Sequence, residues 1–256
     1  MPTWLGRLLP TGLRSLLRGA ARTEIPSMRH LEPDLRLGNL ARLGFAPAFI
    51  LDVGAASGAW ARMAAGVWPR SRIFGVEPNA TNRLSLDATR ADLPAFNYWI
   101  GLLGPGVREQ VAFRAEDVGT SVLSDSTTAE IASADMLTVD ELVLRHALAS
   151  PDFLKLDVQG YELEVLRGAP KVLARCEGIL IEVSFRRFWK GAPVAHEVIM
   201  YLLERGFVWY DVAGILRLEP DDELAQMDLL FVRAGNPVLH RSPWPWPEHG
   251  LEEPKG

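Results

Sequence analysis

Short apolar runs alternate with longer stretches of helical periodicity along most of the chain. Runs that are apolar on both faces are typical of strands buried in a parallel sheet, whereas apolar residues three to four positions apart indicate amphipathic helices. The runs predict strands at 49–53, 72–76, 95–101, 153–158, 178–183, 206–212 and 226–233. The periodic stretches predict helices at 33–45, 58–64, 80–91, 141–149, 162–168 and 194–205. This alternation favours an α/β fold with a doubly wound sheet.

The segments between these elements also contain local signals. Residues 109–114 alternate like a strand of a hairpin. The polar, turn-rich segment 115–135 is the best candidate for a flexible lid or substrate loop. Residues 136–139 predict a short strand, and Asp140 is the expected N-cap of the helix that follows. Gly214 predicts a turn.

Composition and charge narrow the class of protein. With 256 residues, of which 48% are hydrophobic, the chain can bury a full core as one large domain. We expect that domain at 33–235, followed by a proline- and tryptophan-rich tail at 236–256. The formal net charge of −5 gives no general attraction to nucleic acid. The single cysteine, Cys176, excludes an internal disulfide and a cysteine-based metal cluster, and it fits a cytoplasmic location.

The N-terminal residues 1–32 are predicted to be a separate extension. Within residues 1–25, leucines and tryptophan recur at near-helical spacing among arginines, and no acid precedes Glu24. This pattern indicates a basic amphipathic helix that lies on an anionic membrane, or a helix packed on its own domain. Pro10 and Gly12 interrupt the periodicity, and we favour the second interpretation. No apolar run of about 18 residues exists, so no membrane span is predicted.

The turn from Gly54 to Gly58 follows the first central strand and opens a helix. Glycines at such a turn let the backbone approach a ligand, and the first N–H groups of the helix face that ligand. The turn lacks the third glycine of a dinucleotide fingerprint, and the acid Asp52 suits a cationic ligand such as S-adenosylmethionine. Glu77, at the tip of the second strand, is placed to accept hydrogen bonds from ribose hydroxyls. The alternative is an ordinary α/β turn with a surface glutamate.

A second informative stretch begins at the strand 153–158. Alternation puts Lys155, Asp157 and Gln159 on one face, and a buried lysine is costly unless it is paired. These residues therefore form a buried ion pair, or they place Asp157 beside the methyl group of the cofactor. Glu182, at the tip of the adjacent strand, is a second acid in the same crevice. Together the acids and the lysine are candidates to hold a proton acceptor for a substrate hydroxyl.

The aromatic and basic run 185–190 follows that strand. It either binds a sugar ring or an anionic group by stacking and charge, or forms a solvated loop with its aromatic rings in the core. The sequence favours neither interpretation. It also does not indicate an oligomeric state.

These motifs together resemble the FkbM family of S-adenosylmethionine-dependent methyltransferases. The resemblance covers roughly residues 33–233, and its most specific part is Lys155-Leu156-Asp157-Val158-Gln159-Gly160-Tyr161-Glu162. The stretches that match lie at 50–58, 76–78, 137–140, 153–162, 166–169, 181–182 and 228–232. The resemblance implies a class I methyltransferase (Rossmann-like) fold with a seven-stranded, mostly parallel sheet whose last strand is antiparallel. It also implies O-methylation of a hydroxyl, often on a sugar, glycan or polyketide-like small molecule.

The resemblance also implies roles for single positions. Asp52, Gly54 and Gly58 are expected to hold the methionine end of S-adenosylmethionine. The expected cofactor contacts in full are Asp52, Gly54, Ala55, Ser57, Gly58, Glu77, Pro78, Asn79 and Asp157. Two positions depart from the family pattern, since Ala56 stands where the first loop usually has asparagine and Gln159 where the second motif usually has glutamate.

The catalytic residues expected are Asp157 as the first choice of base, Glu182 as the second, and Lys155 beside them. No ligand spacing in the sequence requires a metal ion. An NAD-dependent oxidoreductase is the alternative enzyme, disfavoured by the missing glycine. A catalytically silent scaffold, which binds a partner or a membrane through residues 1–25, is the alternative outside enzymes.

Overall fold

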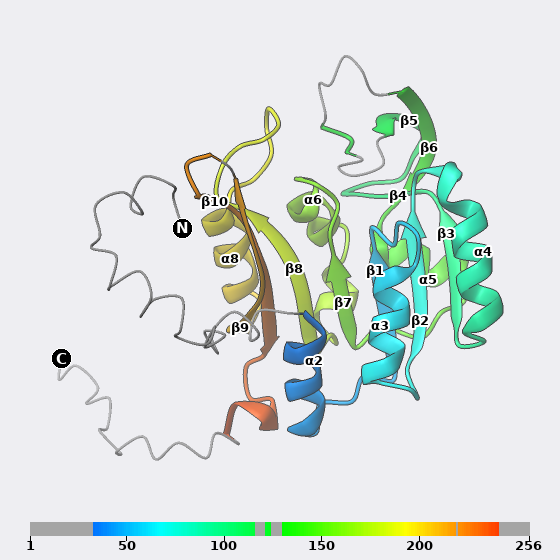
Figure 1. Ribbon diagram of the computed structural model, residues 1–256. Helices are drawn as coiled ribbons and strands as arrows, with labels where there is room; N and C mark the ends of the chain where they lie inside the picture. Colours follow the sequence, from blue (N-terminus) through cyan, green and yellow to red (C-terminus); the bar gives the residue numbers. More distant parts are fainter. Residues whose placement is uncertain (1–32, 116–120, 124–129, 219, 241–256) are drawn as a thin grey trace, which may run out of the picture.

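The computed structural model describes residues 33–115, 121–123, 130–218 and 220–240 (Figure 1). A central sheet has the strand order β3-β2-β1-β7-β8-β10-β9. Its strands are β1 (Phe49–Val53), β2 (Arg72–Glu77), β3 (Phe96–Ile100), β7 (Phe153–Leu156), β8 (Gly178–Ser184), β9 (Phe207–Leu218) and β10 (Glu223–Arg233). Neighbouring strands from β3 to β8 pair in parallel, whereas β10 is antiparallel to both β8 and β9. The predicted seven-stranded class I methyltransferase sheet is therefore confirmed.

Helices cover both faces of this sheet. The first group packs buried residues against one face and comprises α2 (Pro33–Arg42), α3 (Ala59–Val67) and α4 (Arg83–Asp92). The second group packs on the other face and comprises α5 (Val139–Arg145), α6 (Glu162–Arg167), α7 (Pro170–Leu173) and α8 (Ala195–Leu203). Short 3-10 helices η3 and η4 lie at Ala80–Asn82 and Pro237–His240. This arrangement explains why the central strands are largely apolar, since neither face meets water.

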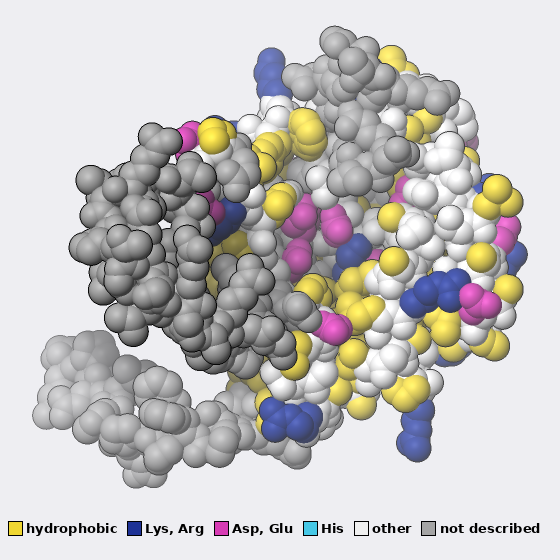
Figure 2. Space-filling model, viewed as in Figure 1, with side chains coloured by type: hydrophobic (Ala, Val, Ile, Leu, Met, Phe, Trp, Pro, Cys, Tyr) yellow, Lys and Arg dark blue, Asp and Glu magenta, His cyan; other side chains and the backbone are white. Residues whose placement is uncertain are grey.

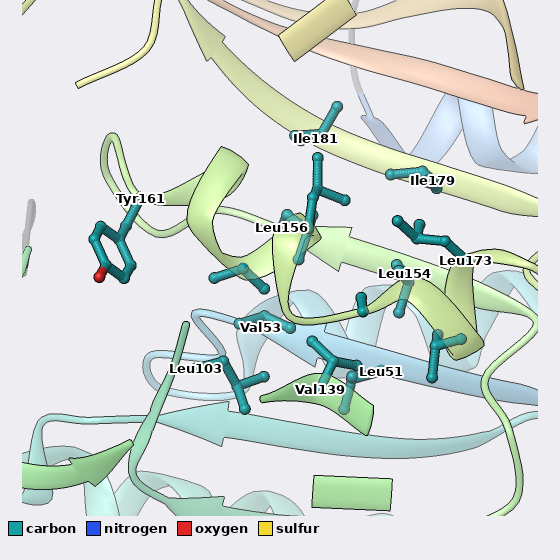
Figure 3. Close-up of a cluster of buried hydrophobic side chains, with 14 of the residues drawn as sticks. Leu51, Val53, Leu103, Val139, Leu154, Leu156, Tyr161, Leu173, Ile179 and Ile181 are labelled. Atoms are coloured by element: carbon teal, nitrogen blue, oxygen red, sulfur yellow. The ribbon is translucent and has the colours of Figure 1, made fainter. Parts of the chain in front are cut away.

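Alternating side chains of the central strands enter two separate hydrophobic clusters. Leu51, Leu154 and Ile179 point to the side of α5 and α7 (Figure 3). Ile50 and Phe153, one position along in their strands, point to the side of α2 and α3 instead. Burial of each such side chain stabilises the fold by roughly 1.5–3 kcal/mol. Both clusters contain side chains of β1, β7 and β8. Packing on both faces therefore holds these strands, and the residues at their ends, in fixed positions.

A smaller sheet adjoins the carboxyl ends of β1 to β3 (Figure 1). Its strands are β4 (Leu102–Leu103), β5 (Arg108–Ala115) and β6 (Glu130–Leu137), in the order β4-β6-β5. The prediction of a flexible segment over 115–135 is wrong for residues 130–135, which belong to β6. The polar composition of this segment suggested a loop, but it reflects the solvent exposure of much of the hairpin. Residues 116–120 and 124–129 of the predicted loop lie outside the described residues.

The predicted cap of α5 is also wrong. Thr138 is the N-cap, and its Oγ1 accepts a hydrogen bond from the Glu141 N–H at 3.0 Å. The carboxylate of Asp140 instead accepts hydrogen bonds from the backbone N–H groups of Lys171 and Val172, both at 3.0 Å. Asp140 therefore caps α7, an element that the sequence did not predict, and it ties two helices together.

The predicted turn at Gly214 is wrong, because β9 continues through this residue to Leu218. Gly214 pairs with Asp228 of β10, and the ladder has an irregularity at this point. A Cβ at Gly214 would overlap the carboxylate of Asp228. The glycine therefore makes room for a side chain of the adjacent strand.

Several predictions fall on residues that the structure does not describe. They include the amphipathic helix and membrane contact of residues 1–25 and most of the C-terminal tail, residues 241–256. Within the described part of the chain, no helix is long and apolar enough to cross a membrane. The assignment of residues 1–32 to an extension, and of residues 236–256 to a tail, stays a prediction.

Candidate functional site

A cavity of ≈ 240 Å³ opens at the carboxyl ends of β1, β2 and β7. This is where ligands bind in open parallel α/β sheets. Leu102, Leu103 and Val122 form part of an apolar wall. Glu77 and Asp157 contribute carboxylates to the same cavity. The combination of an apolar wall with a few polar groups is typical of a small-molecule site.

The predicted site residues occupy two layers around this cavity. Gly54, Glu77, Pro78 and Asp157 line it. The remaining predicted residues lie outside its lining: Asp52, Ala55, Ser57, Gly58, Asn79, Lys155 and Glu182. The predicted site residues that do not line the cavity therefore form a second layer behind those that do.

The carboxylate of Glu77 is held by two backbone N–H groups. Its Oε2 accepts from Ala56 at 2.9 Å, and its Oε1 accepts from Asn79 at 2.8 Å. Burial raises the pKa of Glu77 above its usual value, and these hydrogen bonds oppose that change. The predicted turn after β1 is thus connected directly to the tip of β2.

The two glycines of the turn serve the packing of the chain on itself. Gly54 has φ +82° and Gly58 has φ +83°, a conformation that favours glycine. A Cβ at Gly54 would overlap the carbonyl oxygen of Asp157, and one at Gly58 would lie 2.6 Å from Oγ1 of Thr89. Gly54 also lines the cavity, and the approach of its backbone to a ligand stays a prediction.

A buried ion pair joins β1 and β7 below the cavity. The Nζ of Lys155 lies 3.3 Å from Oδ1 of Asp52 and 3.4 Å from Oδ2 of Asp157, and it donates to the carbonyl of Gly54 at 2.9 Å. Burial alone would lower the pKa of Lys155, but the charges of the two aspartates outweigh it and raise this pKa. Asp52 is fully buried, so it neutralises Lys155 and makes no contact with the cavity. The ion pair that the sequence left as one alternative is present.

Asp157 is linked to Glu182 through one amide. The Nε2 of Gln159 donates to Oδ1 of Asp157 at 2.9 Å and to Oε2 of Glu182 at 3.0 Å. Gln226 donates to the same Oε2 of Glu182 at 2.6 Å. The side chain of Asp157 remains 39% exposed, so this carboxylate is oriented from both sides and still open to a ligand.

Several acids meet at the carboxyl ends of β7 and β8, and Figure 2 shows acidic side chains gathered over this region. Burial, with the charges of Asp157, Glu162 and Asp228, raises the pKa of Glu182 to about 9. Burial also raises the pKa of Glu162 to about 7. Glu182 therefore carries a proton at neutral pH, and its Oε2 can accept from both amides in that state.

Sequence reasoning missed the residues that connect distant segments to this site. The carbonyl of Gln159 accepts hydrogen bonds from Oγ of Ser121 at 2.8 Å and from Nε1 of Trp189 at 2.7 Å. Tyr161 and Asn82 also line the cavity. No local pattern could identify Ser121, because its partner lies far away in the chain.

For the run 185–190, the interpretation with all aromatic rings in the core is wrong for two of them, and the binding of a sugar or an anionic group stays a prediction. Arg186 pairs with Glu223 at 2.7 Å, and Arg187 pairs with Glu197 at 2.8 Å, so both arginines are engaged within the protein. Phe185 and Phe188 are exposed by 42% and 36% of their surface, so these rings lie outside the core. In this run, two aromatic rings are therefore exposed, whereas both arginines are already paired with glutamates.

Among the described residues, no group of three or more His, Cys, Asp or Glu side chains is placed to hold a metal ion. Residues 52–209 match the model of the methyltransferase FkbM domain. The chain belongs to the FkbM methyltransferase family. The resemblance identified from the sequence motifs is thereby confirmed.

The relatives of this FkbM-family chain include one curated protein and several solved structures. The hexuronic acid methyltransferase AglP of Haloferax volcanii is 25% identical over 116 residues, which are 44% of this chain and 48% of AglP. The chain thus matches about half of the length of this relative. The N-terminal domain of EvdMO1, solved in the presence of SAH and D-fucose, is 13% identical with a TM-score of 0.48 and covers 80% of this chain and 84% of that domain. The N-methyltransferase NodS of Bradyrhizobium japonicum is 15% identical with a TM-score of 0.44 and covers 86% and 97%, respectively.

Proposed function

We propose that this FkbM-family protein is an S-adenosylmethionine-dependent O-methyltransferase that acts on a hydroxyl of a sugar or a similar small molecule. One observation carries the proposal. The carboxylate of Asp157 lines the cavity, is partly exposed, and is held in place from both sides by Lys155 and Gln159. A fixed, accessible carboxylate at the end of a central strand suits the removal of a proton from a bound hydroxyl.

The residues around the cavity fit S-adenosylmethionine. The carboxylate of Glu77 faces the cavity and suits ribose hydroxyls, since each oxygen has lone pairs beyond the backbone bonds that it accepts. Leu102 and Leu103 offer apolar surface to a purine ring. The acidic lining suits a ligand with a sulfonium and an ammonium group, and Asp157 contributes to it. When bound, this cofactor supplies an activated methyl group.

The protein has to place the acceptor and to remove one proton. Holding the acceptor oxygen in line with the methyl carbon can lower the barrier by roughly 7–11 kcal/mol, more than the 10²–10⁴-fold that is typical of general-base assistance. Asp157 would accept the hydroxyl proton as the acceptor oxygen bonds to the methyl carbon and the bond between that carbon and the sulfur of the cofactor breaks. Lys155 keeps Asp157 in its orientation, because its ammonium lies 3.4 Å from Oδ2.

The electrostatics favour Asp157 over the other two predicted catalytic residues. Glu182, with its pKa raised to about 9 by burial and by neighbouring acids, is protonated at neutral pH and cannot accept a proton there. Lys155 is charged, since Asp52 and Asp157 raise its pKa above the usual value in spite of burial. We therefore assign Lys155 and Glu182 to the positioning of Asp157.

The proposed acceptor class is supported by the relative and by the surface next to the site. AglP acts on a hexuronic acid, which is a sugar with hydroxyl and carboxyl groups. Phe185 and Phe188 present exposed rings in the segment that contains Trp189. Exposed aromatic rings in a segment that contacts Gln159 through Trp189 are a suitable surface for the apolar face of a sugar.

Two measurements test the proposal. Calorimetric titration is expected to show binding of S-adenosylmethionine and none of NAD. With a panel of sugars and uronic acids, Asp157→Asn is expected to lower turnover at least a hundredfold and to change the cofactor Kd less than threefold. Asp135→Asn, in the smaller sheet, is the control and should leave turnover unchanged. Tighter binding of NAD, or unchanged turnover of Asp157→Asn, contradicts the proposal.

A further inference from the structure

The side-chain amide of Gln159 lies between the two acids of the site. Its Nε2 is 2.9 Å from Oδ1 of Asp157 and 3.0 Å from Oε2 of Glu182. An amide nitrogen carries two hydrogen atoms, so each carboxyl group receives one of them. Both donors of this side chain are therefore used to bring the two acids together.

The backbone of Gln159 aims its side chain at these acids. Its φ of +53° is left-handed, and φ of the next residue, Gly160, is +91°. The Oε1 of Glu162 accepts hydrogen bonds from the N–H groups of Val158 at 3.0 Å and Gly160 at 3.1 Å. Such a conformation costs a non-glycine residue about 1–3 kcal/mol, and it persists where the surroundings determine it fully.

Two further segments hold the same residue from the other side. Oγ of Ser121 and Nε1 of Trp189 both donate to the carbonyl oxygen of Gln159. The ring of Trp189 also packs on Gly160, where a Cβ would lie 2.9 Å from its Cδ1. These contacts hold the backbone position from which the amide of Gln159 reaches the two acids.

Two carboxyl groups that approach the same point need a proton, a donor or a cation between them. We propose that Gln159 is a positioning residue that fixes Asp157 against Glu182, and that its uncharged amide takes the place of a third carboxylate with which these two acids would hold a divalent cation. The uncharged amide orients Asp157 and adds no charge of its own. The role of Asp157 as base rests on the proposed function, whereas the place of the amide between the acids does not.

The geometry of the amide matches that of a cation site. Oxygen ligands about 2.1 Å from an octahedral cation lie about 3.0 Å from one another. This is the spacing between Nε2 of Gln159 and its two carboxylate partners. Gln159→Glu would replace the amide nitrogen by an oxygen of a third carboxylate, within about 3 Å of an oxygen of each of the other two. Gln226 offers a matched control, because its amide contacts Glu182 and not Asp157.

Metal binding tests the inference without any assay of activity. Wild type, Gln159→Glu and Gln226→Glu are titrated with Mn²⁺ in a calorimeter, and thermal unfolding confirms that each is folded. Gln159→Glu is expected to bind Mn²⁺ at least ten times more tightly than wild type, and Gln226→Glu to bind it as weakly as wild type. Equal affinities of Gln159→Glu and wild type, or equal gains in the two variants, overturn the inference.

Kinetics separate positioning from a merely structural role. Gln159→Met is expected to lower kcat at least tenfold with less than a threefold change in the Kd of S-adenosylmethionine, and Gln226→Met to lower it less than threefold. Added Mn²⁺ should restore turnover to Gln159→Glu and not to Gln159→Met. The inference is overturned if the two methionine variants lose kcat equally and each loss follows the fall in Tm of that variant.

If Gln159→Glu does not fold, the comparison of Gln159→Met with Gln226→Met decides. Absence of methyl transfer by wild type contradicts the proposed function alone, and the Mn²⁺ titration still decides this inference.

Discussion

Ala56 and Gln159 both have left-handed backbone conformations, with φ of +46° and +53°, although neither is glycine. Each lies at the cavity, and each belongs to a turn whose partners are fixed by hydrogen bonds. Ala56 has no side chain that could form a compensating local bond, so its strain is offset by the hydrogen bond from its N–H to Glu77. The backbone is therefore strained at two residues that line the cavity.

Relief of this strain should stabilise the protein. Ala56→Gly is expected to raise the free energy of unfolding by about 1 kcal/mol, because glycine adopts positive φ without a steric penalty. Ala65→Gly, in the interior of helix α3, should lower it by about 1 kcal/mol. Urea unfolding of both variants checks the prediction. A loss of stability in Ala56→Gly would show that this turn is not strained.

The protonation of Glu182 predicts a pH dependence of stability. The pKa of Glu182 is raised to about 9 by burial and adjacent acids, above the ordinary value of 4.5 in the unfolded chain. The raised pKa stabilises the folded protein fully below pH 4.5, and this contribution is lost as the pH rises toward 9. Glu182→Gln should therefore become more stable relative to wild type as the pH rises through this range, by up to about 1.4 kcal/mol per pH unit.

Chemical denaturation at several pH values measures this difference. Glu223→Gln, at the exposed start of β10, is the control and should show a difference that does not vary with pH. A constant difference between wild type and Glu182→Gln from pH 5 to pH 9 would contradict the protonated state of Glu182.

Helices α5 and α7 show how one element is held by another. Thr138 caps α5, and Asp140, inside α5, caps α7 through the N–H groups of Lys171 and Val172. The four-residue helix α7 has no side-chain cap of its own at Ala169. Its position on the sheet therefore depends on a carboxylate that belongs to a different helix.

Removal of this cap should destabilise the protein. Asp140→Ala is expected to lower the free energy of unfolding by about 1–2 kcal/mol, since two backbone N–H groups lose their acceptor. Glu141→Ala, which removes an exposed pair with Arg145, should cost less than about 0.5 kcal/mol. Thermal unfolding of both variants provides the comparison, and equal losses would exclude the cap.

The sequence predicted the elements whose periodicity reflects burial on the central sheet. The strands of that sheet and the acids near the tips of β1, β2, β7 and β8 were predicted from apolar runs that end in polar residues. The seven-stranded arrangement with an antiparallel last strand was implied by the family resemblance. The hairpin at β5 and β6 was missed in part, because its side chains alternate on a sheet that is largely exposed. Gly214 was mistaken for a turn, since the sequence does not show that Asp228 needs its space.

The site itself was predictable only where its residues end a strand. Asp157 and Glu77 were found in this way, and both line the cavity. The bridging role of Gln159 depends on contacts with Ser121, Trp189 and Glu182, which are distant in the chain. Long-range contacts of this kind leave no local pattern.

In the part of the chain that the structure describes, two hydrophobic clusters lie on the two sides of one sheet. Cys176 lies in the larger cluster, is fully buried, and follows α7. Burial raises the pKa of its thiol to about 12. A thiol in this state is inert toward alkylating reagents, so its reaction reports the opening of the core.

Labelling of this thiol should therefore follow global unfolding. In native protein, alkylation of Cys176 by iodoacetamide at pH 8 is expected to be at least a thousandfold slower than in unfolded protein. Destabilising variants such as Asp140→Ala should accelerate it about tenfold for each 1.4 kcal/mol by which the free energy of unfolding falls. Mass spectrometry of quenched samples measures the rates. Rapid labelling of the native protein would show that the region of Cys176 opens by itself.

The contact of Gly54 with the carbonyl of Asp157 leaves no gap between the ends of β1 and β7. The loop after β1 and the residue that follows β7 therefore move as one block, and neither can be shifted to enlarge the cavity. Members of the FkbM family that take bulkier ligands should keep this contact and vary side chains that line the cavity, such as Leu102 and Val122.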